Sequence, residues 1–121
     1  MSTKEQFLRD FNNAFANSDI DYISKFVADD IQWIIKGDDA IIGKSNFTTA
    51  LKEMKADEPF ELSIDNIIIH KNKGIVEGSM SSPDGKTYAF CDSYVFSDTD
   101  VPMINKMTSY VISLEKKPVK A

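Results

Sequence analysis

One strand-like stretch carries the residues best placed to do chemistry. From Tyr88 to Phe96 every second residue is aromatic except the central one, Asp92. Because side chains on a strand alternate between its two faces, Asp92 shares a face with these aromatic rings. A carboxylate is costly to place against apolar surface unless it is paired, hydrogen-bonded or protonated, and such groups are frequently functional. The row therefore predicts a pocket with one acid, and the alternative is a solvated aspartate on an edge strand.

The environment of Asp92 decides between these interpretations. In an apolar pocket, desolvation would raise the pKa of Asp92, whereas an ion pair would make it an ordinary structural residue. Tyrosine hydroxyls could lie nearby, although tyrosines that bury a ring and expose the hydroxyl are common in cores. Trp33 either lines the pocket wall or packs in the core, and the two readings differ in whether a cavity adjoins its ring.

Other reactive residues do not form a recognisable site. Gly43-Lys44-Ser45 resembles a phosphate loop, but that motif requires a glycine where Asp38 stands. His70, the only histidine, is predicted to lie on the surface at a strand end, and Cys91, the only cysteine, faces away from Asp92. No spacing of ligands supports a metal centre, and we expect neither a metal nor a cofactor.

Composition indicates a single domain over residues 1–121, which is enough chain to bury one core. The net charge of -5 disfavours nucleic acids and anionic membranes as partners, because both attract cationic surfaces. Three lysines near the end, at positions 116, 117 and 120, indicate a solvated tail. One cysteine, no hydrophobic secretory segment and no stretch of roughly 18 apolar residues predict a cytoplasmic protein with no membrane partner.

Helices and strands divide the chain. Apolar residues at helical spacing predict helices near residues 7–15, 20–27 and 45–54, with a first strand at 31–35 between the second and third. From Phe60 onward the period is two, and a change of phase predicts a bulge near Asp65-Asn66. Further strands are expected near residues 75–81, 88–96 and 103–114, with a polar loop at 97–102. The fold class is α+β, with one sheet face buried under three helices.

This chain resembles the NTF2-like superfamily, and the SnoaL-like branch in particular. The resemblance rests on the two N-terminal helices ending in residues 26–30, the strand with Trp33, the Gly43-Lys44-Ser45 helix entry and the segment 90–96. It implies a cone in which a curved antiparallel or mixed sheet wraps around three N-terminal helices and leaves a deep pocket. It also implies a homodimer through the outer sheet face.

The ketosteroid isomerases of this superfamily allow a comparison residue by residue. Their protonated oxyanion-hole aspartate, which is a known case of a carboxyl kept neutral, falls on Asp92. The resemblance places their general base on Ile35 and their oxyanion tyrosine on Phe11. Since isoleucine cannot move a proton, the isomerase reaction is not expected by this route, although Asp92 could still act as an acid.

The expected pocket is lined by aromatic and sulfur-containing side chains, which favour a small, mostly apolar ligand. Its predicted ligand-binding residues are Trp33, Tyr94, Phe11, Phe15, Ile35, Met54, Met80 and Phe90, with Asp92 as the catalytic candidate. Two alternatives remain: a cyclase, isomerase or dehydratase that uses Asp92 as acid or base, and a non-catalytic dimeric interaction module. A second hydroxyl or titratable group near Asp92 would favour the enzyme, and a closed core with an exposed apolar patch would favour the module.

The opposite face of the aromatic strand predicts a partner. It carries only small, uncharged side chains, whereas a sheet face open to water is normally more polar. We therefore expect a homodimer through this outer face, formed by Ala89, Cys91, Ser93 and Val95.

Overall fold

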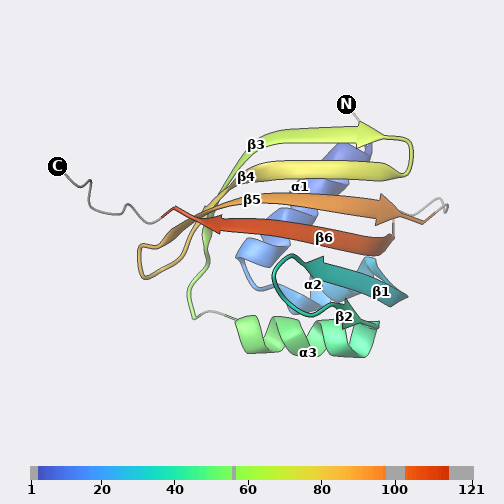
Figure 1. Ribbon diagram of the computed structural model, residues 1–121, viewed down its shortest axis with the longest axis horizontal. Helices are drawn as coiled ribbons and strands as arrows, with labels where there is room; N and C mark the ends of the chain where they lie inside the picture. The colour runs from blue at the N-terminus through green and yellow to red at the C-terminus, as the bar shows by residue number, and fades with distance from the viewer. Residues whose placement is uncertain (1–2, 56, 98–102, 115–121) are drawn as a thin grey trace.

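The computed structural model describes residues 3–55, 57–97 and 103–114. Most of the predicted polar loop and the whole lysine-rich tail lie outside these residues. The helices and strands follow the predicted order (Figure 1). They are α1 (Thr3–Ala16), α2 (Ile20–Lys25), β1 (Val27–Ile35), β2 (Ile41–Ile42), α3 (Lys44–Met54), β3 (Glu61–His70), β4 (Lys73–Ser81), β5 (Thr87–Phe96) and β6 (Ile104–Ser113).

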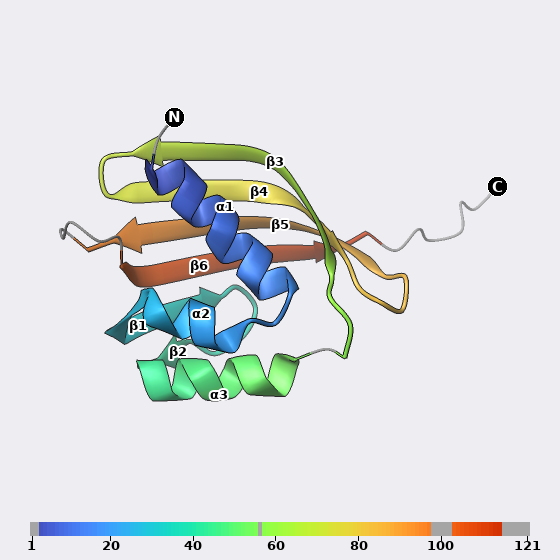
Figure 2. The ribbon, with the colours of Figure 1, turned by 180° about the vertical axis from the view of Figure 1, so that it is seen from behind.

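Six strands form one curved, mixed sheet in the order β2-β1-β6-β5-β4-β3. All neighbouring strands pair antiparallel except β1 and β6, which are parallel. Helix α1 crosses one face of the sheet, α2 lies beside it, and α3 follows the β1–β2 edge (Figure 2). This arrangement confirms the α+β class and the NTF2-like cone that the sequence predicted.

The start of the sheet differs from the sequence prediction in two places. The second helix was expected to include Val27, but α2 ends at Lys25 and Val27 pairs with Ile104 as the first residue of β1. The amide of Ile104 donates to the carbonyl of Phe26 at 2.8 Å, so pairing between distant segments overrides the local helical pattern. The short strand β2 was not predicted, because two residues are too few to show a period.

The predicted bulge in β3 is confirmed, and a glycine on the next strand accommodates it. The register between β3 and β4 shifts between Ile64 and Asn66. Gly78 is paired with Ile64, and a Cβ atom on Gly78 would lie 2.1 Å from the backbone oxygen of Ser63. Only glycine allows this close approach of two backbones, and bulges bend strands. The bend therefore contributes to the curvature of the sheet around the helices.

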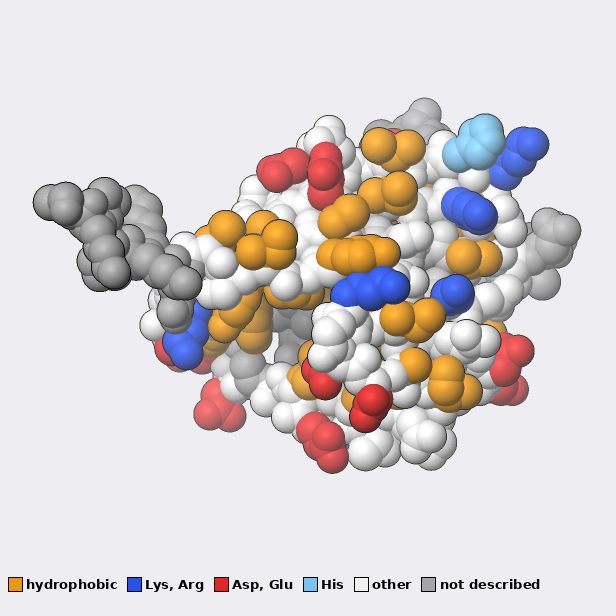
Figure 3. All heavy atoms as spheres, in the orientation of Figure 1, with side chains coloured by type: hydrophobic (Ala, Val, Ile, Leu, Met, Phe, Trp, Pro, Cys, Tyr) orange, Lys and Arg blue, Asp and Glu red, His pale blue; other side chains and the backbone are white. Residues whose placement is uncertain are grey.

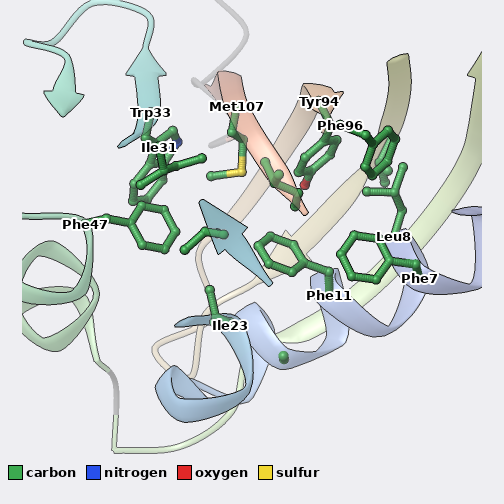
Figure 4. Packing of buried hydrophobic residues seen from close by; sticks show 14 of the residues in the cluster. Phe7, Leu8, Phe11, Ile23, Ile31, Trp33, Phe47, Tyr94, Phe96 and Met107 are labelled. Carbon is green, nitrogen blue, oxygen red and sulfur yellow. The ribbon is translucent and has the colours of Figure 1, made fainter. Parts of the chain in front are cut away.

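Aromatic rings fill the space between α1 and the sheet (Figure 4). Phe11 points from α1 toward β5, where its ring packs edge-on against Tyr94 at 6.0 Å between centroids. Phe7 makes a similar contact with Phe96 at 5.9 Å. Edge-on pairs suit the quadrupoles of the rings, and burying each ring contributes about 1.5–3 kcal/mol. These contacts fix α1, and with it the helix face beside Asp92.

Candidate functional site

A cavity of about 160 Å³ lies between α1 and the concave face of the sheet. An apolar cavity of about 150 Å³ is large enough to bind benzene, so this one can hold a molecule of about one ring. Two of its lining residues, Met54 and Val111, are 55% and 51% exposed and therefore mark its mouth. The full lining is Asn12, Phe15, Trp33, Ile35, Met54, Met80, Phe90, Asp92, Met107, Ser109 and Val111.

The structure brings seven of the nine predicted site residues to this cavity. They are Asp92, Phe15, Trp33, Ile35, Met54, Met80 and Phe90. Phe11 and Tyr94 are placed elsewhere: both are fully buried, and neither is among the residues that line the cavity. Their rings pack against each other in the core, because the inward face of β5 contacts α1 at Tyr94. Only the hydroxyl of Tyr94 reaches toward the site.

Asp92 is the only titratable residue among those that line the cavity. Burial raises the pKa of its carboxyl from 3.8 to about 6, and hydrogen bonds from the Ser109 and Tyr94 hydroxyls limit the rise. The Tyr94 hydroxyl lies 3.4 Å from Oδ2 of Asp92. Burial, and secondly the charge of Asp92, raises the pKa of Tyr94 well above its ordinary value, so the tyrosine stays neutral. Asp92 therefore exchanges a proton near neutral pH.

Trp33 fixes the direction of the Ser109 hydroxyl. Its indole Nε1 donates to Ser109 Oγ at 2.9 Å, and both residues are buried. Since a serine hydroxyl has one hydrogen and now accepts from Trp33, that hydrogen is available to the Asp92 carboxyl. The ring centroid of Trp33 lies 5.5 Å from that of Phe47 in the hydrophobic core. Trp33 therefore both lines the cavity and packs in the core.

A second chain of hydrogen bonds joins Asp92 to α1. Asn12 Nδ2 donates to the backbone oxygen of Leu8 at 2.8 Å and to the Tyr94 hydroxyl at 3.2 Å. Tyr94 can then donate to Asp92, and the side-chain oxygen of Asn12, 3.4 Å from the same hydroxyl, also faces this region. The polar groups form one connected network at one end of an otherwise apolar cavity.

Sequence reasoning missed four lining residues: Asn12, Met107, Ser109 and Val111. The sequence carried a signal for two of them, Asn12 and Ser109. Asn12 is a polar residue at position i+4 from Leu8, on the apolar face of α1, where a buried amide needs partners. Ser109 lies directly opposite Asp92 in the β5–β6 pairing, on the face that alternates with Thr108 and Tyr110.

Two of the three positions matched to functional residues of the ketosteroid isomerases carry apolar side chains. Ile35 lines the cavity and Phe11 is buried in the core. His70 is exposed at the end of β3, away from the residues that line the cavity. Among the described residues, no three or more His, Cys, Asp and Glu side chains lie close enough together to hold a metal ion.

The family model of the SnoaL-like domain matches residues 8–101. The chain belongs to the SnoaL-like domain family. A search of curated proteins finds no match. In the parts of this domain that the structure describes, no helix has the length and apolar character needed to cross a membrane.

Solved structures share the fold of this SnoaL-like domain. An NTF2-like protein of unknown function from Cytophaga hutchinsonii is 28% identical, with a TM-score of 0.66 over 89% of this chain and 98% of that one. An LEH-like epoxide hydrolase of M. tuberculosis is 22% identical, with a TM-score of 0.74 over 88% of this chain and 76% of that one. A proposed SnoaL-like polyketide cyclase from Shewanella putrefaciens is 10% identical, with a TM-score of 0.80 over 92% and 80%. At 22% and 10% identity the last two structures support the fold alone.

Proposed function

We propose that this SnoaL-like domain binds a small, mostly apolar molecule whose oxygen atom lies at Asp92. The observation that carries the proposal is a single carboxyl, with its pKa raised to about 6, at one end of an apolar cavity. When protonated, Asp92 can donate to a carbonyl or ether oxygen, and when ionised it can accept from a hydroxyl. An uncharged ligand fits best, since a carboxylate ligand would meet the ionised fraction of Asp92 without a cation among the lining residues.

A second candidate is an enzyme of the cyclase, isomerase or dehydratase type that uses Asp92 as acid or base. A pKa near neutrality and two hydroxyls in reach of the carboxyl favour it. Asp92 would have to work alone, taking a proton from one atom of the ligand and returning it to another, because no other lining residue titrates. The non-catalytic interaction module requires a closed core, so the cavity favours ligand binding or catalysis over that module.

Ligand binding can be tested with the fluorescence of Trp33, the only tryptophan of the chain. We expect cyclohexanone, a neutral ketone of about the size of the cavity, to change the emission and to saturate. Ile35→Phe should fill part of the cavity and weaken binding about tenfold, which corresponds to about 1.4 kcal/mol of overpacking. Ile34→Phe is the matched control, since Ile34 points to the other face of β1 and should leave binding unchanged.

The outcome that would contradict the pocket proposal is equal binding in both variants, or no saturable signal with the wild-type protein. Native mass spectrometry of the protein as purified provides an independent check, because a ligand retained from the cell adds a fixed mass.

We also propose a homodimer through the outer face of the sheet. Ala89, Cys91, Ser93 and Val95 are only partly exposed there. This face of the sheet carries apolar side chains with basic ones between them (Figure 3). Exposed members of this apolar surface are Ile68, Ile75, Tyr110 and Ile112. A second copy of the chain would cover the same surface on both subunits, as a twofold interface requires.

Sedimentation velocity at micromolar concentration should give the mass of a dimer. Ser93 lies between Ile75 and Thr108 in the middle of the outer face, so Ser93→Arg should place like charges across the twofold axis and give a monomer. Ser45→Arg, at the start of the exposed α3 surface, should remain dimeric. A wild-type monomer would overturn the dimer proposal.

The cytoplasmic location stays a prediction.

A further inference from the structure

A second, smaller hollow of about 110 Å³ adjoins the Asp92 cavity. It lies between α2, α3 and the segment that leads into β3. Three side chains, Phe15, Met54 and Met80, line both hollows and therefore form the partition between them. The remaining lining residues of the second hollow are Ser18, Ile20, Ile23, Leu51 and Phe60.

The partition has one firm part and two adjustable parts. The ring of Phe15 packs edge-on against Trp33 at 5.8 Å and Phe47 at 6.5 Å, and these neighbours hold it in place. Met54 is the last residue of α3 and is 55% exposed, and Met80 lies near the end of β4. Methionine side chains are unbranched, with three rotatable bonds, and they adapt to irregular contacts. The two hollows can therefore connect past the methionines without movement of Phe15.

The two hollows differ in chemistry. The Asp92 cavity has a connected polar network at one end, whereas the second hollow has no charged lining residue and only one hydroxyl residue, Ser18. Its floor is firm, because Ile23 and Leu51 are buried and the amide of Phe60 donates to the backbone oxygen of Ala16 at 2.8 Å. A hollow of this size and lining suits a short hydrocarbon chain and not a second ring.

We propose that the ligand is an uncharged molecule with two parts: an oxygen-bearing head of about one ring at Asp92, and a short hydrocarbon tail that passes Met54 and Met80 into the second hollow. The inference rests on the proposed function, because it assumes that the head occupies the Asp92 cavity. It adds the substrate class: a compact ketone, alcohol or cyclic ether substituted with an alkyl chain.

The first experiment measures how affinity depends on chain length. Cyclohexanone and its 4-alkyl derivatives with straight chains of increasing length are titrated against the wild-type protein, with Trp33 fluorescence as the readout. We expect the dissociation constant to fall on the order of fourfold for each methylene that leaves water, until the second hollow is full, and then to level off.

Two variants locate the tail. Ile20 lines the second hollow and not the Asp92 cavity, so Ile20→Phe should remove the gain from the alkyl chain and leave the affinity for cyclohexanone unchanged. Ile20→Ala should enlarge the hollow and let the gain continue to longer chains, which keeps the test decisive if the larger side chain impairs folding. Ile42→Phe, at an exposed position in β2, is the matched control and should behave as wild type.

The outcomes separate the two proposals. The inference of a tail site is overturned if cyclohexanone binds but the affinity of its alkyl derivatives does not depend on chain length. It is also overturned if Ile20→Phe weakens the binding of cyclohexanone and of the long-chain derivatives equally. Either result leaves the proposed function standing. If neither cyclohexanone nor any alkyl derivative binds, the proposed function fails, and the tail site fails with it.

Discussion

Asp92→Asn should become more stable relative to the wild-type protein as the pH rises from 4 to 8, by about 2 kcal/mol. The pKa of Asp92 is raised from 3.8 to about 6 in the folded protein, mainly by burial. At about 1.36 kcal/mol per pKa unit, the full difference is about 3 kcal/mol, of which about 2 kcal/mol falls between pH 4 and pH 8. Asparagine does not titrate, so the variant lacks this dependence.

The sign follows from proton binding. With a raised pKa, the folded protein binds the Asp92 proton more tightly than the unfolded chain does. The contribution of Asp92 to stability is therefore fully present below pH 3.8 and is lost as the pH rises through about 6. Removing the carboxyl should thus favour the variant at pH 8 and not at pH 4.

Urea denaturation at several pH values measures the difference in the free energy of unfolding between the two proteins, so that groups common to both cancel. Asp84→Asn is a control of opposite sign, because hydrogen bonds from Ser82 and from the Lys86 amide lower the pKa of Asp84. That variant should lose stability relative to wild type as the pH rises. The contrary result is a variant that is less stable than the wild type at neutral pH, with a difference in the free energy of unfolding that does not change with pH. That result would identify Asp92 as an ordinary structural residue.

Gly78→Ala should destabilise the fold by at least about 3 kcal/mol, at the upper end of the range for overpacking. A Cβ atom at this position would lie 2.1 Å from the Ser63 oxygen and 3.0 Å from the Ile64 Cα, which are backbone atoms in the bulge of β3. Backbone atoms cannot rotate away as a side chain can, so the two strands would have to separate.

Gly74→Ala is the matched control, because it is the same substitution on the same strand. Its Cβ atom would meet side chains and not backbone, with Leu8 Cδ1 at 2.7 Å, Ile69 Cδ1 at 3.0 Å and Phe96 Cε2 at 3.3 Å. We expect a loss of about 1 kcal/mol there. Urea midpoints measured side by side check the difference, and similar midpoints for the two variants would show that the close approach at Gly78 does not constrain the fold. Failure of Gly78→Ala to fold, with Gly74→Ala folded, agrees with the prediction.

Much of this fold is visible in the sequence because local patterns and tertiary structure agree. The change of phase after Ile64 indicated a bulge, and the register of β3 against β4 confirms it. The pattern failed at Val27, where pairing with Ile104 in a distant strand replaced a helical turn. Parallel pairing of β1 with β6 leaves no local signal at all, since it depends on segments more than seventy residues apart.

The site was predictable to the extent that alternation along one strand reveals it. Asp92 and Phe90 share a face of β5, and the sequence placed both correctly on the concave side. Alternation cannot say how deep along a face a cavity extends, so Tyr94 was assigned to the lining although it lies in the core. Ser109 was missed for a different reason: alternation with Thr108 and Tyr110 puts it on the inner face, but only the register between β5 and β6 places it opposite Asp92.

The central claim is that Asp92 is a partly buried carboxyl of the cavity that exchanges its proton near pH 6, and carbon-13 NMR of that carboxyl tests it most directly. The signal is assigned by its absence from Asp92→Asn and followed from pH 3 to pH 8. We predict a titration midpoint at about 6, as burial requires. A midpoint at or below the ordinary value of 3.8 would contradict the account, because it would place the carboxyl in water or in an ion pair.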